Sequence, residues 1–161
     1  MRCLCEVDDS GTALPVRSFA ERVLYHGSNS PSIQGALYTN KRDFGWFGAG
    51  FYLTAHLSYA LRWGKYVYEM RIPVGKYARL STNYRTTSYD TDALEAHLYA
   101  GGDDGWILDE HLYAEKFTHY LMGKGYVGVR IALSNTSGGY DDDVEVVVFD
   151  PTTIQVVRRI I

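Results

Sequence analysis

The chain of 161 residues is 46% hydrophobic and 22% charged, with a formal net charge of −3. This length and composition fit a globular domain with a core of its own, and they exclude a disordered chain. The net charge argues against a broad nucleic-acid-binding surface, which is normally basic. No apolar run approaches the roughly 18 residues of a membrane-spanning helix. The N-terminal segment lacks the apolar core of a secretory signal. We therefore expect a cytoplasmic protein, or one delivered into a target cell by a specialised secretion route, with no membrane partner.

Residues 1–18 are predicted to form a loosely ordered leader, because they carry turn signals around residues 8–11 and at Pro15. Both cysteines of the chain, Cys3 and Cys5, lie in this leader. A zinc site needs about four ligands at recognisable spacing, and nothing in the chain supplies their partners. We therefore expect reduced thiols and no bound metal. The sequence carries no internal repeat and no linker, which indicates a single domain over residues 1–161.

The first half of the chain predicts strands and one helix. A strand is expected over residues 22–26, and a second short strand ends at Leu53. Thr54 is a suitable N-cap for a helix over residues 55–63. Three side chains of that helix fall on one face at helical spacing, namely Leu57, Ala60 and Leu61.

The chain from residue 65 onward predicts five strands and two helices. The strands are expected over residues 65–72, 77–80, 126–133, 144–149 and 154–160, and the helices over 90–100 and 106–122. Candidate core residues on the helices are Leu94, Leu98, Leu108, Leu112 and Leu121. Strands at both ends with helices inserted between them predict an α+β domain with a split, mainly antiparallel sheet.

His26 stands at the end of the first strand, where a packing residue is usual. A neutral imidazole offers one donor and one acceptor, so it can orient a ribose hydroxyl. Gly27 has no side chain, so its backbone can approach a planar ligand closely. Ser28 adds a hydroxyl. A strand-end histidine followed by a glycine turn is the alternative interpretation.

Tyr52 and Glu145 are the other two unusual side chains on hydrophobic segments. Tyr52 follows a glycine-rich stretch, and its ring can either stack on a flat heteroaromatic ligand or pack in a β-rich core. Glu145 interrupts a run of valines that reads as a strand buried on both faces. A carboxylate there is costly unless it is paired or lines a cavity; an exposed strand end is the alternative. In a cleft, the carboxylate would stabilise a developing positive charge.

Together these segments resemble the H-Y-E branch of the ADP-ribosyltransferase superfamily, which includes diphtheria toxin and the poly(ADP-ribose) polymerases. The matching motifs are residues 25–28 (Tyr-His-Gly-Ser), residues 48–54 (Gly-Ala-Gly-Phe-Tyr-Leu-Thr) and residues 145–151 (Glu-Val-Val-Val-Phe-Asp-Pro). The last motif looks like the closing strand and turn of bacterial and phage members. The resemblance spans roughly residues 22–157 and keeps the order of the motifs.

The resemblance implies that the fold is of the ADP-ribosyltransferase type and that NAD is the co-substrate. It implies mono-ADP-ribosyl transfer to a macromolecular acceptor, a protein more readily than a nucleic acid, with release of nicotinamide. The backbone of Gly27 would hold the nicotinamide amide. His26 would hold a ribose hydroxyl, and Ser28 would add a polar contact.

The resemblance also implies roles for two aromatic rings and a carboxylate. Tyr52 would stack on the nicotinamide, and Tyr59 would close the other side. Glu145 would hydrogen-bond the 2′-hydroxyl of the nicotinamide ribose. Cleavage of the glycosidic bond releases neutral nicotinamide and leaves an oxocarbenium-like sugar, so a fixed carboxylate is most useful where that charge develops.

The acceptor would be recognised by the loop over residues 134–143, in which Tyr140 is the one aromatic residue. Arginine-modifying members carry a Glu/Gln-x-Glu motif, and here Asp143 stands two positions before Glu145. Asp143 either orients the acceptor or belongs to an acidic loop that stays solvated. The region 90–122 lies where family members differ most, and it is either a lid or a partner surface.

Three other functions stay open. The protein could be an NAD glycohydrolase with water as acceptor, or a transferase that modifies nucleic acid, for which Lys41, Arg42, Arg79 and Arg85 would form a local basic patch. It could also be an inactive module that binds NAD or a partner protein. The small size suggests a toxin, an effector or a phage-borne modifier by analogy.

Overall fold

The structure is a computed structural model that describes residues 6–7, 13–14, 23–33, 43–81, 90–132 and 143–161. Its helices are α3 (Leu57–Trp63), α4 (Thr91–Tyr99), α5 (Gly102–Leu108), α6 (Glu110–Gly123) and the short 3-10 helix η2 (Pro151–Thr153). Its strands are β1 (Glu6–Val7), β2 (Ala13–Leu14), β3 (Val23–Ser28), β4 (Asp43–Gly45), β5 (Gly48–Leu53), β6 (Tyr66–Arg71), β7 (Lys76–Ser81), β8 (Tyr126–Ala132), β9 (Asp143–Val148) and β10 (Gln155–Arg159). β1 and β2 pair with each other, and the rest of the expected leader, with Cys3 and Cys5, lies outside the described residues.

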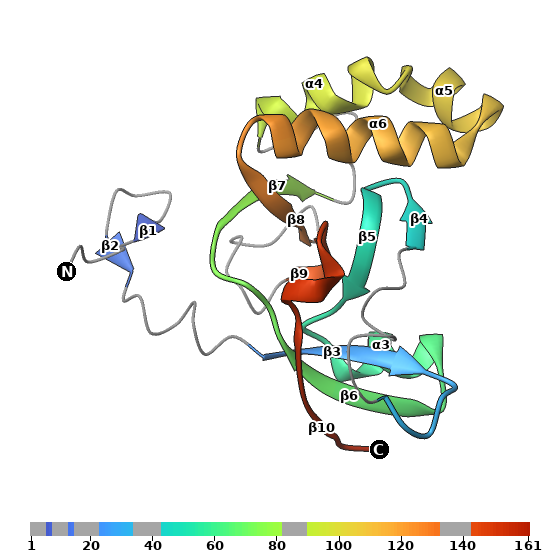
Figure 1. Ribbon diagram of the computed structural model, residues 1–161, viewed down its shortest axis with the longest axis vertical. Coiled ribbons are helices and arrows are strands. Elements are labelled where there is room, and N and C mark those ends of the chain that lie inside the picture. Colours follow the sequence, from blue (N-terminus) through green and yellow to red (C-terminus); the bar gives the residue numbers. More distant parts are fainter. Residues whose placement is uncertain (1–5, 8–12, 15–22, 34–42, 82–89, 133–142) are drawn as a thin grey trace.

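The predicted α+β fold with a split, mainly antiparallel sheet is confirmed. One sheet has five strands in the order β4-β5-β9-β8-β7, and another has three strands in the order β10-β6-β3. Within these two sheets the described pairings are antiparallel, except for β7 with β8. Helices α4, α5 and α6 form a layer over the five-stranded sheet, while α3 lies next to β3 of the three-stranded sheet (Figure 1).

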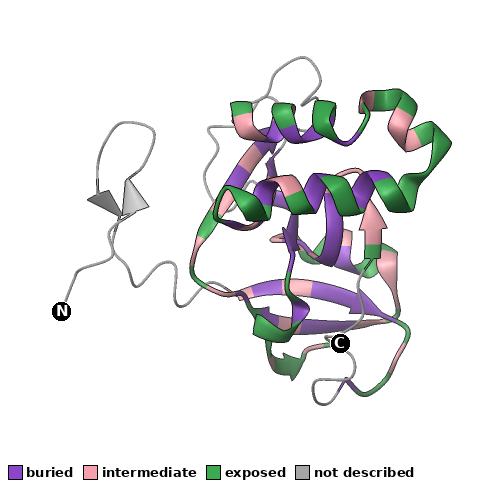
Figure 2. Ribbon diagram, turned by 45° about the horizontal axis from the view of Figure 1, so that its top comes forward, coloured by how far each residue is buried: buried purple, intermediate pink, exposed green. Residues whose placement is uncertain are grey.

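The core has two parts. The first lies between the helical layer and the five-stranded sheet, where Tyr113, Phe117 and Leu121 of α6 pack in a cluster with Val129 and Val147. Each fully buried side chain of this kind contributes about 1.5–3 kcal/mol. The second part unites both sheets and includes Leu24, Phe51, Leu53, Met70 and Val146. Figure 2 shows that the inward sides of α4 and α6 are buried and their outward sides exposed.

The leucines predicted as core residues of the helices are mostly not in the core. Leu121 is fully buried, but Leu98, Leu108 and Leu112 are 65%, 84% and 50% exposed. The helix predicted over residues 106–122 is in fact two helices, because the Asp109 carboxylate accepts a hydrogen bond from the Leu112 amide at 3.0 Å and caps a new helix. This break separates Leu108 from the inward stripe of α6, which starts at Tyr113.

The helix predicted over residues 55–63 is shorter, and its N-cap is His56 rather than Thr54. Thr54 is fully buried, and its hydroxyl accepts a hydrogen bond from the His56 amide at 3.0 Å. Of the three side chains expected on the buried face, only Ala60 is buried, while Leu57 and Leu61 are 39% and 46% exposed. The helix therefore approaches the sheet through a small residue.

The two sheets meet at one antiparallel bridge. The Tyr25 amide donates to the Thr54 carbonyl at 2.8 Å, and the Thr54 amide donates to the Tyr25 carbonyl at 2.9 Å. This bridge joins the middle of β3 to the residue that follows β5. It brings β3 of the three-stranded sheet next to β5 of the five-stranded sheet.

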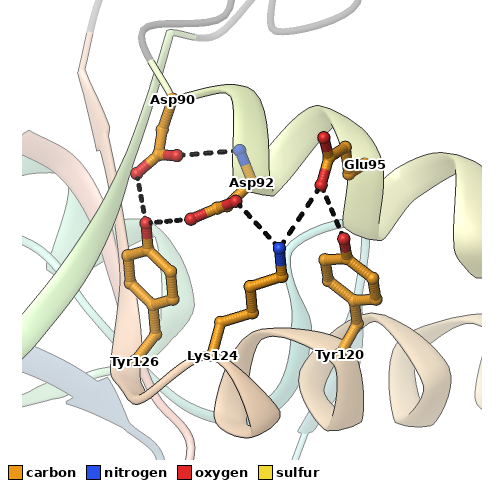
Figure 3. Close-up of polar contacts among 6 residues, drawn as sticks. All are labelled: Asp90, Asp92, Glu95, Tyr120, Lys124 and Tyr126. Carbon is orange, nitrogen blue, oxygen red and sulfur yellow. Dashed lines mark hydrogen bonds and ion pairs between the residues drawn. The ribbon is translucent and has the colours of Figure 1, made fainter.

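A polar network fastens the start of α4 to the end of α6 and the start of β8. Its six side chains are drawn in Figure 3: Asp90, Asp92, Glu95, Tyr120, Lys124 and Tyr126. The Tyr126 hydroxyl lies 2.9 Å from Asp90 Oδ2 and 2.8 Å from Asp92 Oδ2. Lys124 Nζ lies 3.5 Å from Asp92 Oδ1 and 3.6 Å from Glu95 Oε2. The hydrogen bond from Tyr126 is the main cause that lowers the pKa of Asp92.

We predict that Tyr126→Phe lowers the melting temperature by about 2–4 °C near pH 7, because it removes the hydroxyl that links the two aspartates. Since the folded-state pKa of Asp92 is lowered, this stabilisation is present above the ordinary aspartate pKa near about 4 and is lost as the pH falls below it. Calorimetry across this range measures the effect. Tyr99→Phe, on the exposed side of α4, is the control, and an equal loss in both variants would contradict the role of the network.

Candidate active site

An open hollow of about 620 Å³ lies beside the junction of the two sheets. This volume is within the range of about 300–1,000 Å³ that small-molecule sites occupy. Its lining comes from residues 26–30 at the end of β3, residues 43–45 of β4, Phe51 and Tyr52 of β5, Trp63 of α3, and Glu145 of β9. Strands that lie far apart in sequence thus bring His26, Tyr52 and Glu145 to one hollow.

His26 is buried at the side of this hollow, with 8% of its surface exposed. Its Nδ1 lies 3.0 Å from the carbonyl oxygen of Tyr52, and its ring lies 4.4 Å from the ring of Phe51. A carbonyl oxygen only accepts hydrogen bonds, so Nδ1 carries the proton. In the neutral ring Nε2 is therefore the acceptor, which suits a donating hydroxyl of a ligand.

Gly27 is required by packing against α3. A β-carbon at this position would overlap the carbonyl oxygen of Ala60 and lie 3.2 Å from Cβ of Trp63. The sequence interpretation attributed the glycine to a close ligand approach, whereas the observed close approach is by a helix. The Ser28 hydroxyl has a structural role, because it accepts a hydrogen bond from the Ser30 amide at 3.0 Å. This bond shapes the loop that lines the hollow.

The side chain of Tyr52 lies over the hairpin of β4 and β5. Its hydroxyl donates to the carbonyl oxygen of Gly48 at 2.7 Å. A β-carbon at Gly45 would lie 2.5 Å from the same hydroxyl oxygen, so a glycine there makes room for the ring. Burial, and after it the nearby charge of Glu145, raises the pKa of Tyr52 well above its ordinary value. The ring is therefore neutral and held in one orientation.

Glu145 is diagonal to Tyr52 on the same face of the five-stranded sheet. Tyr52 pairs with Val147, and Glu145 precedes Val147 by two residues, so their side chains point to the same side. On the other neighbouring strand Glu145 pairs with Ile131. Glu145 is half-buried, and this burial raises its pKa above the ordinary value. A carboxylate next to a hollow and partly removed from water is suited to stabilising positive charge.

The residues that line the hollow include two carboxylates, Asp43 and Glu145. Among the described lining residues there is no lysine or arginine. The electrostatic character of the hollow is therefore negative, which favours a cationic or electron-poor group.

Two residues predicted to belong to the site, Tyr59 and Asp143, do not line the hollow, and a third lies outside the described residues. Tyr59 does not line it; its ring lies edge-on to His56 at 5.7 Å, and the Arg62 guanidinium lies 4.9 Å from the ring centre. Tyr140 lies outside the described residues, as does nearly all of the loop 134–143.

Asp143 also does not line the hollow. It is fully buried, and it forms two hydrogen bonds with Arg130, Nε to Oδ2 at 3.0 Å and Nη2 to Oδ1 at 3.3 Å. The interpretation of Asp143 as part of a solvated acidic loop is therefore wrong. Its carboxylate is held by a guanidinium at the start of β9, two residues before Glu145.

The sequence interpretation missed Trp63, Phe44 and Asp43 as lining residues. Trp63 carries no local signal, because its place depends on the packing of α3 against Gly27 of β3. Phe44 and Asp43 carry none either. Their place depends on the pairing of β4 with β5, in which Asp43 lies opposite Gly50 and Phe44 opposite Ala49.

No protein-family model matches the chain, and no curated protein matches it. Among solved structures, it is similar to one described as "Crystal structure of an anti-CRISPR protein", with a TM-score of 0.44 and 18% sequence identity. The match covers 84% of this chain and 95% of that chain. A likeness of this size carries no argument about function.

Among the described residues, no group of three or more His, Cys, Asp or Glu residues is placed to hold a metal ion. No described helix is long and apolar enough to cross a membrane.

We predict that Glu145→Gln raises the melting temperature by about 2–4 °C near pH 7, because it removes a half-buried charge. The pKa of Glu145 is raised on folding, so folding favours its protonated form more than the unfolded chain does. The folded state is therefore destabilised as the pH rises through this pKa. The difference in melting temperature between the variant and the wild type should vanish below the ordinary glutamate pKa of about 4.3.

Differential scanning calorimetry at several pH values measures this difference. Glu115→Gln, which removes an exposed carboxylate from α6, is the control and should change little. A melting temperature of Glu145→Gln below that of the wild type at neutral pH would show that Glu145 is stabilised by a partner in the folded state.

Proposed function

We propose that the protein is an NAD-dependent ADP-ribosyltransferase that cleaves NAD, releases nicotinamide and transfers ADP-ribose to a macromolecular acceptor, a protein in preference to a nucleic acid. The observation that carries the proposal is the convergence of His26, Tyr52 and Glu145 on one hollow from strands β3, β5 and β9. These are the residues on which the resemblance to the H-Y-E branch rests, and their order in the chain is the order that the resemblance requires.

The residues present fit NAD as substrate. NAD supplies a glycosidic bond between ribose and a positively charged nicotinamide ring, and cleavage of this bond leaves nicotinamide neutral and moves the positive charge to the ribose. The negative lining of the hollow suits such a charge. Tyr52 offers a neutral ring with a fixed orientation for stacking, and Trp63 is a further aromatic side chain of the lining.

His26 and Glu145 have separate tasks in this proposal. Nε2 of His26 accepts a hydrogen bond from a ribose hydroxyl, because Nδ1 already donates to the Tyr52 carbonyl. The Glu145 carboxylate stabilises the positive charge as it develops on the ribose, since a half-buried charge is screened little by water. Glu145 also accepts the proton of the attacking nucleophile or orients that nucleophile. His26 therefore governs binding and Glu145 governs rate.

For the reaction, we predict that Glu145→Gln lowers the rate of nicotinamide release at least 100-fold, while the Kd for NAD changes by no more than about threefold. Glutamine has nearly the same shape but no charge, so it keeps the contacts of the bound state and loses those of the transition state. The wild-type rate should fall on the acid side with a midpoint above about 4.3, since the pKa of Glu145 is raised and the carboxylate must be ionised.

Chromatography of released nicotinamide and calorimetry of NAD binding measure the two quantities. Glu115→Gln serves as the control and should release nicotinamide at the wild-type rate. Equal rates in Glu145→Gln and the wild type would remove Glu145 from the mechanism. Absence of nicotinamide release by the wild type at millimolar NAD would leave a binding module of the same fold as the remaining interpretation.

For binding, we predict that Tyr52→Ala raises the Kd for NAD about tenfold or more, because stacking of aromatic rings contributes about 0.5–1.5 kcal/mol beyond the burial of the ring. Tyr52→Phe keeps the ring and loses the hydrogen bond to Gly48, so its Kd should remain within about twofold of the wild-type value. Circular dichroism establishes that both variants are folded. Undiminished affinity in folded Tyr52→Ala would contradict the stacking role.

A further inference from the structure

The helical layer is strongly acidic compared with the rest of the chain. Residues 90–123 contain eight aspartates and glutamates and one lysine, a net charge of −7. The remaining residues contain eleven acidic and fifteen basic side chains, a net charge of +4. The small overall charge of −3 therefore hides an acidic layer on an otherwise basic chain.

The turn between α5 and α6 adds exposed apolar side chains to this acidic layer. Ile107 and Leu108 are 77% and 84% exposed, and Leu112 is 50% exposed. Four carboxylates flank them, namely Asp103, Asp104, Asp109 and Glu110, and all four are exposed. We call residues 103–112 the α5–α6 corner. Figure 2 shows α5 and the start of α6 with mostly exposed outer surfaces.

Trp106 is the aromatic side chain of α5 that packs against the domain. The ring of Trp106 stacks on Trp46 with a centre-to-centre distance of 4.5 Å, and it meets Tyr113 edge-on at 5.6 Å. None of the residues of α5 is fully buried. Asp103 adds an ion pair with His97 at 3.3 Å. The corner is therefore anchored through aromatic and charged side chains, while its aliphatic side chains are exposed to water, as is typical of a surface that binds a partner.

The corner also adjoins the candidate active site. The imidazole of His111, within the corner, stacks on the ring of Phe44 at 4.0 Å with an angle of 17° between the rings. Phe44 itself lines the hollow. Strand β4 thus contributes to the hollow and contacts the corner, so a macromolecule seated on the corner would lie next to the site where ADP-ribose is transferred (Figure 1).

We propose that the α5–α6 corner docks the acceptor of ADP-ribose, and that this acceptor is a protein with an apolar surface surrounded by lysines and arginines. The proposal rests on the proposed function of the hollow. Complementary charge favours such a partner over others, since an apolar centre with an acidic rim matches an apolar centre with a basic rim. The phosphates of a nucleic acid would be repelled by this surface. If the corner bound a second copy of the chain, the same carboxylates of both copies would face each other and repel.

The test uses two variants of the corner and one control in the full chain. The apolar variant is Ile107→Ser with Leu108→Ser, and the charge variant is Asp104→Lys with Glu110→Lys. Because these side chains are exposed, the variants should fold as the wild type does. The control is Val74→Ser with Val157→Ser, two aliphatic side chains that are 48% and 42% exposed and do not line the hollow.

Each protein is incubated with radiolabelled NAD, once in buffer alone and once with a nuclease-treated bacterial lysate as the source of acceptors. In buffer, water takes the place of the acceptor, so nicotinamide release there measures the activity of the hollow itself. Label on precipitated lysate protein measures docking of the acceptor. We expect both corner variants to release nicotinamide in buffer within about twofold of the wild type and to label lysate protein at least tenfold less. The defect of the charge variant should shrink in high salt, because salt screens exposed charges. The control should match the wild type in both assays.

If both corner variants label lysate protein as strongly as the wild type, the docking proposal is overturned and the proposed function stays intact. If the wild type releases nicotinamide but labels no protein, the docking proposal is overturned, and of the proposed function only the cleavage of NAD with water as acceptor remains. If the wild type releases no nicotinamide in buffer, both the docking proposal and the proposed function are overturned. Label on nucleic acid in a lysate without nuclease would exclude a protein acceptor. If light scattering shows a wild-type dimer that the apolar variant converts to a monomer, the corner binds a second copy and not an acceptor.

Discussion

The candidate site depends on the bridge between Tyr25 and Thr54, where two backbone hydrogen bonds join the three-stranded sheet to the five-stranded sheet. Each residue of the bridge adjoins the candidate site: His26 follows Tyr25, and Thr54 follows the strand that carries Tyr52. The hydrogen bond from His26 Nδ1 to the Tyr52 carbonyl crosses the same junction. Because backbone bonds hold the junction, the distance between His26 and Tyr52 is set by the fold and not by mobile side chains.

Glu145 reaches the site through the register of β9. The start of this strand is held by the buried ion pair of Asp143 with Arg130 and by the Ala55 amide, which donates to the Asp143 carbonyl at 3.2 Å. A shift of one residue would turn Glu145 to the opposite face of the sheet. A buried ion pair often adds little to the free energy of unfolding. A strand register that separated the two partners would, however, leave an unpaired buried charge and be strongly destabilised. We infer that the position of Glu145 is specified by the neighbouring charges, at the cost of a half-buried carboxylate.

Much of the architecture follows from patterns that are visible along the chain. Alternation of side chains predicted β6, a run of valines predicted β9, and the order of elements predicted the α+β fold with a split sheet. The predictions that failed concern which side of a helix is buried and which distant residues are in contact. Leu98, Leu108 and Leu112 have the spacing of core residues, yet the short α5 and the cap at Asp109 leave them in water. Asp143 was interpreted as a loop residue, because no local pattern shows its pairing with Arg130.

The sequence by itself determined which side chains are chemically unusual for their segments, and His26, Tyr52 and Glu145 could be singled out because each departs from the local hydrophobic pattern. Tertiary structure decided which of their neighbours complete the site: Trp63 lines the hollow, whereas Tyr59 does not. It also decided that the glycine after His26 accommodates a helix. The physical reason is that periodicity records the direction in which a side chain points within its own element, while the identity of its partners depends on how distant elements pack.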